Sequence, residues 1–247
     1  MLHSQPESTY VSQQKRPSEI IFVRHAESDR NAVKQGNVYF ADDAARAKVY
    51  GVPDHRIQIT ERGREQARIT GVYMRDRFKR PHFVYHTGYA RTEQTMELVL
   101  AAQPKRAIKK IQVRMNPFIR EREPGFAYDM TTAEAENAFP WLQEYWQTFG
   151  GFFARPPGGE SLSDVLNRVY TFVNMLFRDR QGKCVWVFTH GGTLRLIRMV
   201  LERWDYEQAL RWPKGQSPQN CGITRYAYDT KKKRLTLTEY NTTAWKE

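Results

Sequence analysis

The sequence predicts an α/β protein in which a mostly parallel central sheet is covered by helices on both faces, a three-layer α/β/α arrangement. Short apolar runs alternate along the chain with longer stretches whose apolar residues repeat with a helical period. Such alternation builds crossover units, which set the strands parallel and place helices on both faces. The 247 residues, 40% of them hydrophobic, fit one large domain of this class.

Four apolar runs are the candidate parallel strands, at residues 20–23, 83–85, 111–115 and 185–188. Each is predicted to be a strand buried on both faces, as parallel strands are. Residues 223–228 and 235–240 alternate instead and flank the basic run 231–234. This pattern predicts a hairpin with a solvated tip, in preference to a nucleic-acid patch.

Three stretches carry a helical pattern. Thr60 can cap a helix in which four residues share one face, Ala67, Gly71, Met74 and Phe78. Residues 91–102 are a second candidate. In a third, seven apolar residues between positions 162 and 176 follow the i, i+3, i+4, i+7 rhythm behind a cap at Ser161 or Ser163.

Two segments stand outside this alternation. Residues 1–17 are rich in Ser, Gln and Pro and lack an apolar period, so we expect a disordered leader before a single domain at 18–247. Residues 31–55 are long for a connection. They are expected to form either a lid or substrate loop, or a short extra helix through 41–49.

The composition limits the classes of function. No apolar run approaches the roughly 18–20 residues that cross a bilayer, and the first residues lack a signal-peptide core, so we expect a cytoplasmic protein away from the membrane. Cys184 and Cys221 are too few for a disulfide framework and are expected to be reduced. The net charge of +12 would attract a phosphate ester, a nucleic acid or a membrane surface, and does not choose among them.

Histidines and arginines follow several of the predicted strands, where a parallel sheet presents its ligands. Arg24 and His25 follow the first strand, and His190 follows the last with two glycines behind it. Arg91 begins a predicted helix, whose amino end favours anions. The H-E-x-x-H metal-binding spacing is missing from the sequence, and no metal is expected.

These motifs resemble those of the histidine phosphatase superfamily, also called the phosphoglycerate-mutase-like family. Residues 24–31, Arg-His-Ala-Glu-Ser-Asp-Arg-Asn, are similar to its opening signature Arg-His-Gly-Glu-Ser-x-x-Asn. Further blocks follow in the family's order at 59–67, 87–95, 121–125, 158–161 and 190–191. The resemblance runs from about residue 20 to the C-terminus and implies the histidine phosphatase fold.

The resemblance also implies a phosphatase that hydrolyses small phosphomonoesters through a phosphohistidine on His25, with no cofactor. A phosphomonoester carries about −1.5 to −2 charges, so its attack needs local positive charge. Arg24 and Arg91 would each grip two phosphate oxygens with a planar guanidinium. His190, when protonated, would add a donor as charge develops in the transition state.

The acid that protonates the leaving alcohol is assigned from the family block. Glu121 and Glu123 would leave the same face of an extended chain, so spacing does not choose between them. Gly125 fixes the register of the block and selects Glu121. Asn31 and Thr193 are carried over as further phosphate donors by family analogy alone.

The chain departs from the family pattern in three places. Ala26 replaces the glycine after the nucleophile, and Thr87 with Gly88 replaces Ser-Pro. Gly192 and Thr193 stand where mutases tend to have Asn-Ser, which favours the phosphatase branch. A phosphoglycerate-type mutase and a catalytically inactive basic binding module stay open as alternatives. The expected partner is a small phosphorylated substrate, without nucleic acid, and a homodimer is left open.

Overall fold

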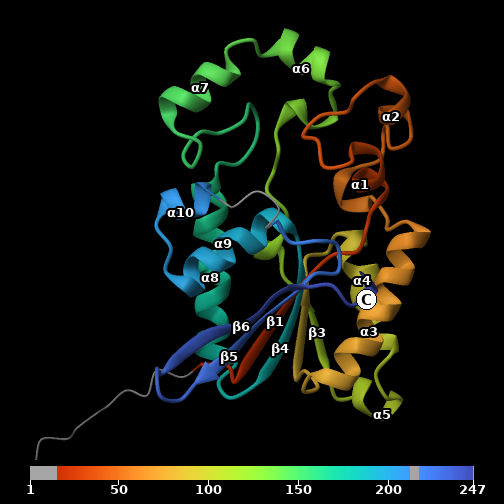
Figure 1. The fold of residues 1–247 in the computed structure, drawn as a ribbon, viewed down its shortest axis with the longest axis vertical. Coiled ribbons are helices and arrows are strands. Elements are labelled where there is room, and N and C mark those ends of the chain that lie inside the picture. The colour runs from red at the N-terminus through yellow and green to blue at the C-terminus, as the bar shows by residue number, and fades with distance from the viewer. Residues whose placement is uncertain (1–15, 212–216, 247) are drawn as a thin grey trace, which may run out of the picture.

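The computed structural model describes residues 16–211 and 217–246 (Figure 1). Its centre is a sheet with the strand order β3-β2-β4-β1-β5-β6. The strands are β1 (Glu19–Arg24), β2 (Phe83–His86), β3 (Gln112–Met115), β4 (Cys184–Thr189), β5 (Ile223–Asp229) and β6 (Arg234–Thr242). The first four pair in parallel, whereas β5 and β6 add an antiparallel hairpin to β1. The predicted three-layer α/β fold is confirmed.

Helices cover both faces of the sheet. α3 (Glu61–Arg77) and α4 (Ala90–Ala101) lie on one face, and α8 (Leu162–Asp179) and α9 (Gly191–Glu202) lie on the other (Figure 1). Thr60 accepts a hydrogen bond from Gly63 N and so caps α3. Ser161 forms a capping box with Asp164 and begins α8. All three predicted helices are confirmed, with boundaries within three residues.

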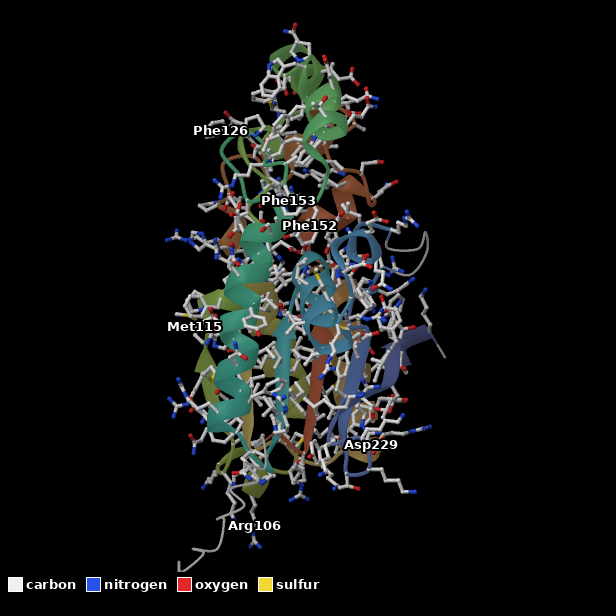
Figure 2. All side chains as sticks on the ribbon, turned by 90° about the vertical axis from the view of Figure 1, so that its left-hand side faces the viewer. Arg106, Met115, Phe126, Phe152, Phe153 and Asp229 are labelled. Atoms are coloured by element: carbon white, nitrogen blue, oxygen red, sulfur yellow. The ribbon has the colours of Figure 1, made fainter. Side chains whose placement is uncertain are left out.

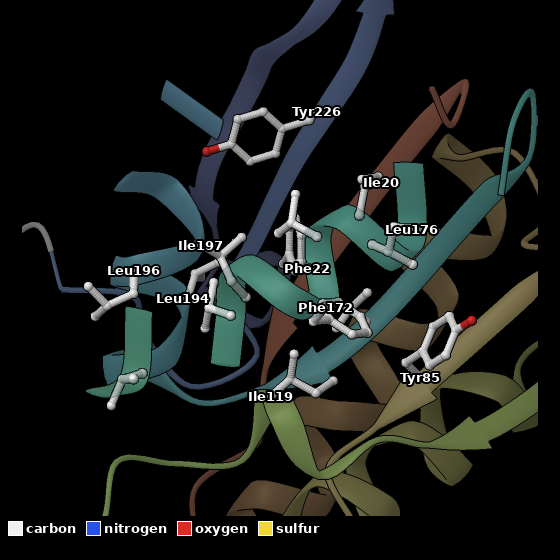
Figure 3. Close-up of a cluster of buried hydrophobic side chains, with 14 of the residues drawn as sticks. Ile20, Phe22, Tyr85, Ile119, Phe172, Leu176, Leu194, Leu196, Ile197 and Tyr226 are labelled. Atoms are coloured by element: carbon white, nitrogen blue, oxygen red, sulfur yellow. The ribbon is translucent and has the colours of Figure 1, made fainter. Parts of the chain in front are cut away.

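Alternate side chains of β1 divide the core into two clusters. Ile20 and Phe22 pack toward α8 and α9, where Phe172 and Ile197 meet them (Figure 3). Ile21 and Val23 point to the α3 and α4 side of the sheet. Burying one such side chain contributes about 1.5–3 kcal/mol, so the two clusters hold β1 rigidly where it delivers its last residues to the site.

β3 differs from its prediction. Its residues were expected to be buried on both faces, yet all four are exposed, with Val113 at 46% and Met115 at 59%. The reason is its place at the edge of the sheet, where β2 is its partner on one side alone. The sequence does carry a signal of this difference, because Gln112 and Arg114 interrupt the apolar run, whereas residues 20–23 and 185–188 are apolar throughout.

A cap rises above the carboxyl ends of the parallel strands (Figure 1). One part comes from the long segment after β1, with α1 (Asp29–Lys34), α2 (Asp43–Ala47) and η1 (Asp54–Arg56). The other comes from the chain after β3, with η2 (Pro117–Ile119), η3 (Phe126–Asp129), α6 (Thr132–Ala138) and α7 (Leu142–Phe149). Phe40 joins the two parts by backbone hydrogen bonds to Met130 and Thr132 of 3.1 and 3.0 Å. The short helix expected within 41–49 is present as α2.

The remaining elements are α5 (Lys105–Ile108), α10 (Tyr206–Leu210) and η4 (Ala244–Lys246). Of the predicted leader, residues 1–15 lie outside the described residues. Arg16 is part of the fold, because its carbonyl accepts from Gly182 N at 2.9 Å and its guanidinium lies 3.8 Å from the Phe177 ring centroid. Both cysteines are free and buried.

The hairpin tip lies far from the cap. Figure 2 shows Asp229 near one end of the molecule and Phe126 near the other. Residues 231–234 are exposed, as predicted for a solvated tip. Among the described residues, no helix is long and apolar enough to cross a membrane.

Candidate active site

A cleft of about 300 Å³ opens between the sheet and the cap. Five of the residues predicted for the site line it, namely Arg24, His25, Asn31, Arg91 and Glu121. His190 lies behind His25, with the two ring centroids 5.1 Å apart. Strand ends separated by up to 166 positions therefore meet at one edge of the sheet, as parallel strands require.

His25 is oriented for attack by its Nε2 atom. The ring is 3% exposed, and its Nδ1 lies 2.7 Å from the carbonyl oxygen of Ala26. A carbonyl can only accept, so Nδ1 carries the proton and the lone pair of the neutral ring is on Nε2. Burial, followed by the charges of Arg91 and Arg24, lowers the pKa of His25 well below its ordinary value. The ring is therefore neutral and nucleophilic at neutral pH.

Arg24 is held at the end of β1 with part of its guanidinium unused. Nη1 donates to the carbonyl of Pro218 at 2.6 Å. Nε is buried and has no hydrogen-bond partner among the described residues. A buried N–H without a partner costs about 1–3 kcal/mol. An anion in the cleft is the natural acceptor for it.

Arg91 lies in the first turn of α4 and is 5% exposed. Its Nη1 and Nη2 donate to the two carboxylate oxygens of Asp54, both at 3.1 Å, and Nη1 also donates to the Asp54 carbonyl at 2.7 Å. Tyr128 from the cap donates its hydroxyl to the same carboxylate. Asp54 thus binds the side of the guanidinium that carries Nη1 and Nη2. The edge formed by Nε and the second hydrogen of Nη2 is left to bind a phosphate.

Sequence analysis missed both Asp54 and Tyr128. Asp54 belongs to the segment that was flagged as a lid or substrate loop, but no local feature selected this residue. Its partners are 37 and 74 positions away along the chain. Only the folded structure brings the three groups together.

His190 is fully buried at the N-cap of α9. Its Nε2 lies 3.1 Å from Thr87 Oγ1. Its Nδ1 has no hydrogen-bond partner within 16–211 and 217–246 and is 3.9 Å from Glu121 Oε2. Burial, followed by the charges of Arg91, His25 and other cations, lowers the pKa of His190 well below its ordinary value. The free site therefore holds two neutral imidazoles.

The loop after η2 places Glu121 over the histidines. Arg168 binds this loop through the carbonyls of Phe118, Arg120 and Glu121 at 2.8, 2.8 and 3.1 Å. A side chain at Gly192 would put its Cβ 2.7 Å from Glu121 Oε1, so a glycine is needed there for the carboxylate to fit.

Glu123 is placed differently from Glu121. It is not among the residues that line the cleft, and its backbone N–H donates to Glu160 at 2.9 Å. The position of Gly125 selected Glu121 over Glu123, and Glu121 is the one of the two that lines the cleft.

The two donors carried over by analogy differ in position. Asn31 lines the cleft, and its Oδ1 accepts from Ser28 and from Asn220 at 3.2 Å, which leaves its amide hydrogens for a ligand. Thr193 is fully buried and does not line the cleft, because its hydroxyl donates to the Arg120 carbonyl at 2.6 Å. On this geometry Thr193 supports the loop that carries Glu121, and its expected contact with phosphate finds no support.

Two further cations line the cleft on the cap side. Arg30 pairs with Asp129 at 3.1 Å, and Lys34 Nζ donates to the carbonyls of Val38 and Tyr128 at 2.6 and 2.9 Å. Burial and the charge of Arg30 lower the pKa of Lys34 to about 8. In the part of the chain that the structure describes, no three His, Cys, Asp or Glu residues are grouped to hold a metal ion.

The sequence of this chain matches a known protein family. The family model of the histidine phosphatase superfamily (branch 1) matches residues 20–241. The chain belongs to this superfamily.

Known relatives of this chain include both mutase-type proteins and phosphatases. Phosphoglycerate mutase-like protein AT74 of Arabidopsis thaliana is 31% identical over 78% of this chain, which spans 60% of that relative's length. The 2,3-bisphosphoglycerate-dependent phosphoglycerate mutase of Rhizobium meliloti is 29% identical over 78% of this chain and 83% of its own. The crystal structure of the alpha-ribazole phosphatase from Shigella flexneri has a TM-score of 0.69 at 18% identity, covering 91% of this chain and 96% of its own.

Proposed function

We propose that this protein hydrolyses small phosphomonoesters through a phosphohistidine on His25, without a metal ion or another cofactor. The observation that carries the proposal is the orientation of His25, whose bare Nε2 lies in a cleft beside two arginines. Phosphoryl transfer depends mainly on alignment and charge stabilisation, and these side chains supply both.

The reaction would run in two steps. In the first, Nε2 of His25 attacks phosphorus, the ester P–O bond breaks, and the leaving oxygen takes the proton of Glu121. In the second, water attacks the phosphohistidine while the Glu121 carboxylate takes a proton from it. The P–N bond then breaks, and inorganic phosphate leaves with His25 and Glu121 restored. Arg24 and Arg91 hold the equatorial oxygens in both steps.

The charge of the cleft suits one phosphate group. Four cationic side chains line it, Arg24, Arg30, Lys34 and Arg91. Two carboxylates also line the cleft, Asp54 and Glu121, and Asp129 pairs with Arg30. When Glu121 carries the proton that it donates, an excess of two positive charges is left, close to the charge of a phosphomonoester dianion. A bisphosphate would bring about twice that negative charge.

A mutase is the second candidate, supported by the mutase relatives and by the phosphohistidine that both reactions share. The two differ in the final acceptor, which is water in a phosphatase and a substrate hydroxyl in a mutase. A non-catalytic binding module is disfavoured because a buried, aligned nucleophile with a neutral ring serves no binding purpose.

The test is release of inorganic phosphate from a panel of phosphomonoesters, without a bisphosphate primer and in the presence of EDTA. The His25→Ala variant is the blank. Turnover of several esters in the wild type alone supports the proposal. Phosphate transfer between two positions of phosphoglycerate, dependent on a bisphosphate and faster than phosphate release, would replace it with the mutase.

A further inference from the structure

A chain of hydroxyl groups runs from His190 into α4. His190 Nε2 lies 3.1 Å from Thr87 Oγ1, which lies 2.8 Å from Thr92 Oγ1, which in turn lies 2.8 Å from the carbonyl oxygen of Tyr89. Thr87 is 3% exposed, and Thr92 and His190 are fully buried. Each hydroxyl has one proton, so the direction of every bond in the chain can be assigned by counting protons.

The carbonyl oxygen of Tyr89 can only accept a hydrogen bond. At 2.8 Å the Thr92 hydroxyl must donate to it, and its single proton is then used. Thr87 must therefore be the donor in its contact with Thr92. With its own proton used, Thr87 can only accept, from the backbone N–H of Tyr89 at 3.2 Å and from His190. The proton of neutral His190 therefore lies on Nε2, and Nδ1 is bare.

We propose that Thr87 and Thr92 are positioning residues that fix His190 with its proton on Nε2, so that a bound phosphate group must bring or take up one proton at Nδ1. This inference rests on the proposed function for its ligand. Nδ1 has no hydrogen-bond partner among the described residues, which is costly for a buried group. It lies 3.9 Å from Oε2 of Glu121, which lines the cleft, so a phosphate bound there is the partner that we infer for Nδ1. A phosphate oxygen facing a bare Nδ1 would be repelled, whereas one facing Nδ1–H would be bound.

The proton balance is simple. Binding of the dianion consumes one proton from solvent, which bonds to Nδ1, while the monoanion brings that proton on its own oxygen. In both cases no bond within the substrate changes. Above the second pKa of the phosphate, about 6, productive binding would therefore fall about tenfold per pH unit.

The groups around His190 define the site at which this proton must be held. The His25 ring, just after β1, lies 5.1 Å from the His190 ring, and the charges of Arg91 on α4 and Arg24 on β1 act on it. Arg168 faces it from α8, and Glu121 Oε2 lies 3.9 Å from Nδ1. The cations oppose a second proton in the free site, so its uptake requires the negative charge of the phosphate.

Substitution of Thr92 separates this role from simple packing. Thr92→Val keeps the size of the side chain but removes its acceptor, so Thr87 is freed to donate to His190 Nε2. The proton of His190 then moves to Nδ1, and a dianion can be bound without proton uptake. Thr92→Ser keeps the hydroxyl and is the matched control.

The tautomer is read directly from ¹⁵N–¹H spectra of the free protein with labelled histidines, with the His190 signals assigned by their loss in His190→Gln. We expect a protonated Nε2 in the wild type and in Thr92→Ser, and a protonated Nδ1 in Thr92→Val. A protonated Nδ1 in the wild type overturns the proposal without reference to any variant.

The functional readout is kcat/KM for p-nitrophenyl phosphate between pH 6 and 8, since this ester scarcely needs the acid Glu121. The ratio of Thr92→Val to wild type should rise about tenfold per pH unit, while that of Thr92→Ser stays flat. A flat ratio for both variants contradicts the proton uptake. If the tautomers shift as expected but no ester is hydrolysed, the control of the His190 tautomer by Thr87 and Thr92 is supported and the proposed function is wrong.

Discussion

Replacing Arg91 with alanine would remove a proposed phosphate-binding group and leave Asp54 without its cationic partner. The Nε edge of Arg91 can make two charge-assisted hydrogen bonds to phosphate, each worth about 1.5–3 kcal/mol. Their loss alone lowers kcat/KM by on the order of 10²-fold or more. The unpaired Asp54 carboxylate, with its side chain 24% exposed, then repels the incoming phosphate by roughly 1–2 kcal/mol.

The double variant Arg91→Ala/Asp54→Ala removes this repulsion. Its kcat/KM for p-nitrophenyl phosphate should recover about 5–30-fold relative to Arg91→Ala and remain far below wild type. Asp54→Ala alone should lower kcat, because Arg91 is no longer aligned, while inorganic phosphate inhibits at least as tightly as before. Steady-state kinetics of the wild type, the two single variants and the double variant complete this double-mutant cycle. A double variant no faster than Arg91→Ala would refute the placement of Asp54 beside the bound phosphate.

Three more predictions concern the acid, the packing of α3 and the metal. Glu121→Gln should slow esters with poor leaving groups about 10²-fold more than p-nitrophenyl phosphate, and Glu123→Gln should slow neither selectively; the opposite pattern would reassign the acid. Gly63→Ala should lower the free energy of unfolding by about 1–3 kcal/mol in urea titrations, because its Cβ would lie 2.2 Å from Glu27 O. Gly151→Ala, whose Cβ meets only a flexible side chain at 3.4 Å, should cost less, and equal costs would contradict the steric account. Activity should persist in EDTA, whereas loss restored by a divalent ion would indicate a metal enzyme.

The sequence predicts which residues meet on the sheet side of the cleft, because these residues directly follow the parallel strands. Apolar runs locate the strands, and parallel topology then brings the residues that follow them to one edge. His25 and His190 meet for this reason, although 165 positions separate them. Arg91 is found by the same logic, since it opens the helix after a strand.

The cap half could not be predicted, because its contacts depend on tertiary structure. Asp54 reaches Arg91 only after the segment following β1 folds over the cleft, and Tyr128 reaches Asp54 from the other half of the cap. The position of the Thr193 hydroxyl could not be predicted for a related reason. Family analogy gives a position on α9 but not the direction of its hydroxyl, which turns to a carbonyl of the adjoining loop.

The proposed mechanism depends on His25 as the nucleophile, and trapping the phosphoenzyme tests this most directly. The protein is mixed with a ³²P-labelled phosphomonoester, quenched in alkali within milliseconds to seconds, and the labelled residue is identified by mass spectrometry. We expect an acid-labile, alkali-stable phosphohistidine at His25 that is absent from His25→Ala. A phosphoenzyme that is alkali-labile, or that persists in His25→Ala, would contradict the mechanism.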